Sequence, residues 1–390
     1  MPDAPDVEGF SLTHCGPVDR ALARVGLRGA QPMRLLLRAF LPALIVWVPL
    51  AALAWLEPRS EEAAAVGFFQ DLATHVRFLL FVPLLILVEA SIGRRTRQVA
   101  EQFTQAGIVA PASQPRFEGY LRRARAAIDS ALAETMIAGL AAFLVWSAVR
   151  ALESDGVLFW SEETAGARVH LSTAGWWYAI GSVVPLFLLL RWAWRYLVWC
   201  WLLYRMSRLD LRLVATHPDL SSGLAFVSFG HTAFTGLAFA VSCLVAGAVG
   251  TRVLHEGAAL AAYQWPLAVF VVLAIVVGLA PLAVFWRPMR IAREEGILAY
   301  GTFASRYAQD FQRRWIGTEE GRSPLSAAAD ISGLADVGGS FERVYSMRLL
   351  PVSLKTAMAF AVAAAAPLLP LLLTVMPLKD LLKLLMQAMI

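Results

Sequence analysis

The chain has 390 residues, of which 58% are hydrophobic and 16% are charged, and its formal net charge is +5 at pH 7. Soluble domains carry roughly 25% charged residues, so this composition excludes an ordinary soluble globular protein and predicts a polytopic membrane protein. The arginines gather at the ends of apolar runs, and the positive-inside rule explains this excess without a nucleic-acid partner.

The leader, residues 1–33, is polar and carries Arg20, Arg24 and Arg28. A spacing of four places these arginines on one face of a short helix, which suits attraction to anionic lipids at the inner leaflet. A solvated tail is the alternative. The leader lacks the apolar core of a signal peptide, so the first spanning helix is expected to target the chain to the membrane.

Seven apolar runs follow, each long enough to cross a bilayer core, which takes about 20 helical residues. Arg-rich and acidic loops alternate between them and predict a cytoplasmic N-terminus and a periplasmic C-terminus in a bacterial inner membrane. In an alternative, the last run is re-entrant and the tail returns to the cytoplasm. The runs lie at about 35–56, 76–92, 132–151, 176–213, 220–254, 265–286 and 355–376.

The fourth, fifth and sixth runs are longer than a membrane requires. The fifth, at about 35 residues, would measure about 52 Å as a helix, against a hydrocarbon core of about 30 Å. The excess predicts a cytoplasmic stalk formed by residues of about 196–225 and 287–350. The expected fold is therefore an all-α membrane domain over residues 34–390, with seven transmembrane helices and cytoplasmic extensions of helices 4–6.

Four ionisable residues in these runs are candidates for a function: Arg191 and Arg195, one turn apart in the fourth run, and Glu89 and Glu134 in the second and third. Charged groups at such depth are functional candidates. In one interpretation they form an intramembrane charge network, or the arginines reach the lipid surface. In the other, the arginines bind lipid phosphate and the glutamates bind a cation or relay a proton.

A short polar elbow, His217-Pro218-Asp219, separates the fourth and fifth runs. We expect Pro218 to end the incoming helix, Asp219 to cap the next one and His217 to pack on the stalk. A catalytic or metal-binding His/Asp pair is the alternative, although no third ligand is near in sequence. In the fifth run, His231 is expected to be a buried hydrogen-bonding residue.

The last run is rich in alanine and contains Pro367 and Pro370. Kinked backbone at membrane depth normally lines protein or water, so these prolines, with Thr374 and Met376, are candidates to line a pore. A tightly packed structural helix is the alternative.

No Walker, HExxH, GxSxG or CxxC motif occurs, and the three cysteines (Cys15, Cys200 and Cys243) are far apart. These patterns predict neither a metal nor a cofactor and disfavour a nucleotide-driven pump or a familiar hydrolase. Whether the chain is an enzyme stays open, and the missing motifs weigh against an enzyme.

Three blocks, at 207–224, 329–348 and 367–378, resemble a family of uncharacterised bacterial multi-pass membrane proteins, which implies location only. The seven-span plan is similar to that of the insect chemoreceptor ion channels, in which subunits assemble through the cytoplasmic bundle and the last helix lines the pore. This likeness of plan favours a homo-oligomeric, channel-like protein that conducts ions or small solutes. The alternative is a membrane enzyme or lipid-binding protein at the cytoplasmic leaflet.

Overall fold

The computed structural model describes residues 10–13, 20, 32–56, 67–155, 161–164, 168–255, 257–316 and 324–373. Most of them are helical, which confirms the all-α prediction. The α-helices are α2 (Pro32–Leu56), α3 (Leu72–His75), α4 (Val82–Gln105), α5 (Gln114–Ile128), α6 (Ala131–Asp155), α7 (Thr173–Met206), α8 (Ala225–His231), α9 (Thr235–His255), α10 (Gln264–Leu279), α11 (Trp286–Phe311), α12 (Pro324–Tyr345), α13 (Leu354–Ala365) and α14 (Leu369–Leu372).

Short 3-10 or π-helical turns extend or join several of these helices. They are η3 (Phe68–Gln70), η4 (Val76–Phe81), η5 (Pro111–Ser113), η6 (Thr232–Phe234), η7 (Leu260–Tyr263), η8 (Ala280–Phe285), η9 (Gln312–Ile316) and η10 (Ala366–Leu368). One small antiparallel hairpin joins α6 to α7, with strands β1 (Ser161–Thr164) and β2 (Arg168–Leu171).

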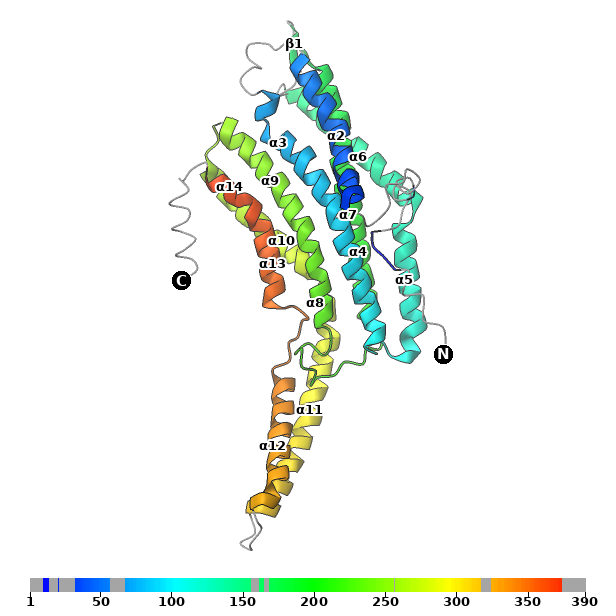
Figure 1. The fold of residues 1–390 in the computed structure, drawn as a ribbon, viewed down its shortest axis with the longest axis vertical. Coiled ribbons are helices and arrows are strands. Elements are labelled where there is room, and N and C mark those ends of the chain that lie inside the picture. The colour runs from blue at the N-terminus through cyan, green and yellow to red at the C-terminus, as the bar shows by residue number, and fades with distance from the viewer. Residues whose placement is uncertain are drawn as a thin grey trace.

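Within the described chain, seven helical segments are long and apolar enough to cross a membrane, which confirms a multi-pass membrane protein. The last one, α13 with α14, starts beside the stalk and runs along α9 and α10 (Figure 1). The segments are Met33–Leu56, Leu72–Gln105, Ala131–Ala151, Thr173–Met206, Ala225–Leu254, Leu260–Ile316 and Leu354–Leu372.

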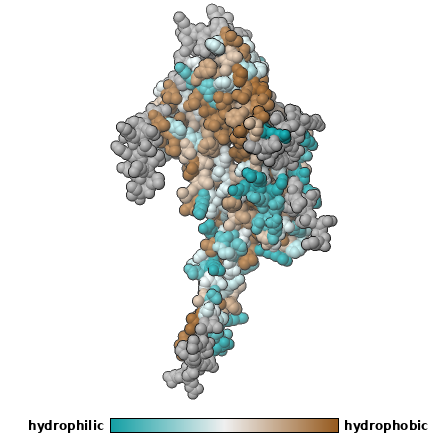
Figure 2. Space-filling view, in the orientation of Figure 1, coloured by the Kyte–Doolittle hydropathy of each residue, from teal (hydrophilic) through white to brown (hydrophobic). Residues whose placement is uncertain are grey.

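The molecule is an elongated bundle with a stalk at one end (Figure 1). The α11 and α12 helices form this stalk, packed side by side, and they carry the chain out of the bundle and back into it. Apolar side chains cover the surface of the bundle away from the stalk, and polar side chains are concentrated near the junction with the stalk (Figure 2). This distribution is what a bilayer around the upper bundle requires.

The helices that form the stalk differ from those predicted. The α7 helix ends at Met206 rather than near residue 213, and α8 begins at Ala225 rather than at 220. Residues 207–224 instead form an irregular segment, which we call the junction loop. Leu220 and Ser222 have positive φ angles of 54° and 55° there, and helix cannot continue through such residues. The excess length of the sixth span does form the stalk, as predicted.

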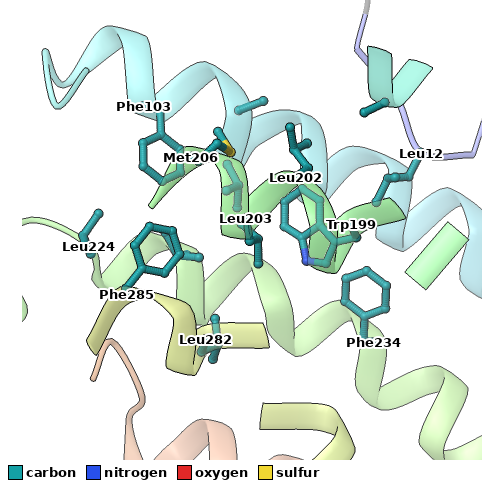
Figure 3. Close-up of a cluster of buried hydrophobic side chains, with 14 of the residues drawn as sticks. Leu12, Phe103, Trp199, Leu202, Leu203, Met206, Leu224, Phe234, Leu282 and Phe285 are labelled. Carbon is teal, nitrogen blue, oxygen red and sulfur yellow. The ribbon is translucent and has the colours of Figure 1, made fainter. Parts of the chain in front are cut away.

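The largest hydrophobic core of the described residues runs along the inside of the bundle and reaches Val344 and Met347 at the stalk. Figure 3 shows part of it. The α7 helix presents Trp199, Leu202, Leu203 and Met206 to it, and the spacing i, i+3, i+4, i+7 puts all four on one helix face. The cluster shown also contains Leu12, Phe103 of α4, Leu224, Phe234 of η6, and Leu282 and Phe285 of η8. Burial of each such side chain contributes roughly 1.5–3 kcal/mol, so this core fixes the helix ends near the stalk.

Part of the leader belongs to this core. Residues 10–13 are buried, with Leu12 and Thr13 fully inaccessible, and Arg97 of α4 donates from Nε to the carbonyl of Phe10 at 3.1 Å. These four residues are therefore not a solvated tail. Arg20 is exposed, whereas Arg24 and Arg28 lie outside the described residues.

Glycines in the fifth span allow close contact with α4. A Cβ atom on Gly230 would lie 2.1 Å from Cγ2 of Val99, and one on Gly236 would lie 2.6 Å from Cγ2 of Val88. Gly223, in contrast, lies in the junction loop with φ of 88°.

We expect Gly230→Ala to lower the free energy of unfolding by about 1–3 kcal/mol, because the added methyl group forces α8 away from α4. The matched control is Gly139→Ala in α6, where an added Cβ meets nothing within 4 Å. It should be neutral or stabilise by roughly 0.5–1 kcal/mol, since alanine favours helix over glycine. Denaturant unfolding in micelles, followed by circular dichroism, measures both. Equal stability of the two variants would show that the contact at Gly230 relaxes without cost.

Candidate functional site

The predicted intramembrane charges come together around Glu89 of α4. Its Oε1 accepts from Nη1 of Arg195 at 2.7 Å and from Nη1 of Arg191 at 3.4 Å. Its Oε2 accepts from Nη2 of Arg38 at 2.7 Å. Glu134 accepts from Nε of Arg191 at 2.8 Å. We call these five residues the charge network.

The network ties four spans together. Arg191 and Arg195 lie one turn apart on α7, so both side chains reach the same neighbours. Glu89 comes from α4, Glu134 from the first turn of α6 and Arg38 from α2. Arg195 also donates from Nη2 to the carbonyl of Thr13 at 3.4 Å, so the buried leader segment contacts the network as well.

Sequence reasoning identified four members of the network and missed Arg38. The position of Arg38 inside an apolar run was the available signal. Glu134 lies in the first turn of α6. Glu89 lies far from the end of α4, because that helix continues past the predicted end near residue 92 to Gln105.

The burial of the two arginines bears on the two interpretations of their role. The side chains of Arg191 and Arg195 are only 5% and 2% exposed, and both are engaged by carboxylates. Lipid phosphates at a leaflet surface have almost no access to such groups. The geometry therefore favours a charge network that joins the spans over a phosphate-binding site.

The elbow residues lie within the junction loop. Burial acts to raise the pKa of Asp219, but hydrogen bonds from the backbone N–H groups of Ala225, Ser221 and Gly223, together with His217, outweigh it and hold that pKa below its ordinary value of 3.8. The three N–H···O distances are 3.0, 2.8 and 3.1 Å. Asp219 is therefore a carboxylate enclosed by its own loop.

The predicted roles of the elbow residues need correction. Pro218 does not end α7, which has already stopped at Met206. Asp219 is not the N-cap residue of α8, since Leu224 occupies that position, but it accepts from the N–H of Ala225, the first residue of the helix. The imidazole of His217 is 44% exposed and its Nδ1 lies 2.8 Å from Oδ1 of Asp219. No group of three His, Cys, Asp or Glu side chains suited to a metal gathers among the described residues.

The junction loop contacts three other parts of the chain. Its Asp210 and Arg212 exchange backbone hydrogen bonds with Ala110 and Ile108, in the corner between α4 and α5. Its Leu220 accepts from the N–H of Arg348, which lies between α12 and α13, at 2.8 Å. On the stalk, a Cβ atom on Gly296 of α11 would lie 2.7 Å from the methyl group of Ala215. The loop thus joins the bundle, the stalk and the approach to the last span.

The last span is kinked where its prolines predict. Pro367 lies in η10 and Pro370 in α14, so the helix tightens to 3-10 geometry between α13 and α14. Thr374 and Met376 lie outside the described residues. One face of α13 packs against α9 and α10. The opposite face carries large apolar side chains about one per turn: Leu354, Met358 and Val362, continued by Leu369 and Leu373. We call these five residues the apolar stripe.

His231 is buried and hydrogen-bonded, as expected. Its Nδ1 accepts from Nε1 of Trp199 at 3.3 Å, which leaves Nε2 as the protonated nitrogen that donates to the carbonyl of Gly278. Pro281 in η8 has no N–H and deprives the carbonyl of Val277 of its usual helical partner. The hydroxyl of Tyr196 donates to that carbonyl instead. Two side chains thus satisfy the carbonyls released where α10 changes to η8.

Comparison with known proteins finds no protein-family model, no curated protein and no solved structure that matches this chain. The family resemblance drawn from the sequence blocks stays a prediction. The geometry of this multi-pass membrane protein is the basis for the function proposed below.

Proposed function

We propose that the chain is one subunit of a homo-oligomeric, channel-like protein of the bacterial inner membrane, in which the last span lines a path for ions or small solutes. The observation that carries this proposal is the apolar stripe on α13, which lies opposite the face packed on α9 and α10. Rings of apolar side chains close channels by expelling water. In an oligomer, one stripe from each subunit would form such a ring.

Connectivity supports the same role. The α13 helix follows α12 through the short linker 346–353, so a shift of the stalk pulls directly on the last span. The junction loop holds that linker by the Arg348–Leu220 hydrogen bond. The charge network, in contrast, fastens α2, α4, α6 and α7 to one another. We assign these four spans to a fixed frame and the last span to the moving part.

The proposed orientation follows the arginine-rich loops, with the stalk and the N-terminus in the cytoplasm and the C-terminus in the periplasm. The alternative of a membrane enzyme or lipid-binding protein at the cytoplasmic leaflet relied on accessible arginines. Because Arg191 and Arg195 are buried and paired, we place this alternative second.

Cysteine cross-linking tests the assembly. In a background in which Cys15, Cys200 and Cys243 are alanine, we expect Val362→Cys to form disulfide-linked dimers under mild oxidation in membranes. The matched control is Phe143→Cys on α6, which is equally exposed at 63% against 62% for Val362 but faces lipid in this proposal. Monomer alone at Val362, or the same dimer yield at both positions, would contradict it.

Ion flux tests the path itself. A hydroxyl group in the apolar stripe should let water enter the constriction, so we expect Val362→Ser to raise ion leakage from proteoliposomes while Phe143→Ser leaves it unchanged. If Val362→Cys forms the disulfide-linked dimer but Val362→Ser leaves leakage unchanged, the assembly is supported and the conducting path is contradicted.

A further inference from the structure

A cavity of about 320 Å³ lies between α10 and the rest of the bundle. Its walls come from α4, α7, α9 with the preceding η6, α10 and α13, and aromatic rings of Trp192, Tyr196, Phe234, Phe270 and Phe360 form much of them. The α10 helix is the most hydrophobic of the long helices that the structure describes, yet only Gly278 in it is buried. It therefore stands partly away from its neighbours and leaves the cavity beside it.

The lining offers almost no polar surface. The hydroxyl of Tyr196 is bound to the Val277 carbonyl, and the carbonyl of Gly278 is bound to His231. The indole N–H of Trp192 donates to the carbonyl of Leu85 at 3.0 Å. Apolar cavities of this kind do not hold water, because a buried water needs two to four polar partners.

The cavity is open at the side of a bundle that a bilayer surrounds. Leu273 and Val277 of α10, which line it, are 56% and 48% exposed. The material that reaches these residues at membrane depth is the hydrocarbon of lipid chains. An empty space of this size would also forgo the dispersion contacts that a filled one provides.

We propose that this cavity is a binding site for one acyl chain of a membrane lipid, which inserts between α10 and the α7–α9 wall. Recognition is by the chain and not by the headgroup, since the polar atoms of the lining identified above already have hydrogen-bond partners. The site is separate from the charge network, but Trp192 contacts both: its ring lines the cavity and the Arg195 guanidinium lies 5.4 Å from its centroid.

Photo-cross-linking tests the site on the full chain in vesicles of phosphatidylcholine that carries a diazirine in one acyl chain. We expect preferential labelling of the α9 peptide with Leu237 and Val241 and the α10 peptide with Leu273 and Val277, above the labelling of α6 around Phe143. Equal labelling of all lipid-exposed helices would overturn the proposal.

Filling the cavity sharpens the test. Ala238→Trp and Ala274→Trp place an indole in the space, so we expect labelling of the α9 and α10 peptides to fall to the level seen on α6. The matched control is Ala142→Trp on the exposed side of α6, which should leave labelling unchanged. Should either tryptophan variant fail to fold, Ala238→Leu gives a smaller obstruction, and its expected readout is loss of a retained lipid in native mass spectrometry. Undiminished labelling or lipid retention in folded variants would refute the site.

Headgroup exchange provides a further readout. We expect the same labelling when the diazirine chain is carried by phosphatidylglycerol, because the lining has no charged residue. Labelling that depends on the headgroup would overturn recognition by the chain alone.

Discussion

Replacement of Glu89 by glutamine should lower the free energy of unfolding by about 3–5 kcal/mol, the usual result of removing one partner from a buried ion pair. Glu89 accepts hydrogen bonds from Arg38, Arg191 and Arg195, and its side chain is only 6% exposed. Glutamine has nearly the same shape but no charge, and its amide group would direct N–H donors at guanidinium donors. Two buried arginines, Arg191 and Arg195, and the part-buried Arg38 would then lose their shared anion, so the loss comes from charge and not from packing.

Glu118→Gln is the matched control for this prediction. Glu118 pairs with Arg122 one helical turn along α5 at 4.0 Å, and the arginine side chain is 67% exposed. Exposed pairs of this kind contribute about 0–1 kcal/mol. Urea unfolding in micelles of a defined detergent compares the two variants with the parent chain. A loss below about 1 kcal/mol for Glu89→Gln would mean that water already screens the network and that it does not hold the four spans together.

Asp219→Asn should destabilise the junction loop by about 3 kcal/mol, since hydrogen bonds to a charged acceptor contribute about 1.5–3 kcal/mol each and this side chain is partly hydrated. Oδ1 accepts from the N–H groups of Ser221 and Gly223, and Oδ2 accepts from that of Ala225. Asparagine keeps one oxygen and turns an amide N–H₂ toward the remaining backbone donor. Leu220 and Ser222 have positive φ angles, which cost conformational energy. Without the Asp219 hydrogen bonds, that cost is no longer offset.

The pH dependence of this variant follows from the lowered pKa of Asp219. A carboxylate whose pKa is lower in the folded state stabilises fully above its unfolded pKa, near 3.9, and loses this contribution as the pH falls through the folded pKa. The stability difference between parent and variant should therefore shrink as the pH falls below about 4.

Asp210→Asn, in the same loop, is the control for Asp219→Asn. Its side chain is exposed and its backbone carbonyl makes the structural contact, so we expect a change within about 0.5 kcal/mol. A difference between parent and Asp219→Asn that grows as the pH falls below about 4 would show that the carboxylate is not the stabilising form.

The seven spans and the excess length of the sixth could be predicted from the amino-acid sequence, because hydropathy and helix length are local properties of a run of residues. The kink at Pro367 and Pro370 could be predicted for the same reason, since a proline disrupts its own helix in any surroundings. The presence of charges at membrane depth was equally visible, as Arg191, Arg195, Glu89 and Glu134 interrupt apolar runs.

Only the tertiary structure decided what these charges contact and where the long helices stop. Glu89 is separated by 51, 102 and 106 residues from Arg38, Arg191 and Arg195, so their pairing follows from how the spans pack and not from any local pattern. The junction loop resembles a helix continuation in sequence, but its hydrogen bonds to Ile108, Ala110 and Arg348 hold it in an irregular path. These partners are distant in sequence, and for that reason the stalk consists of α11 and α12 alone among the described helices.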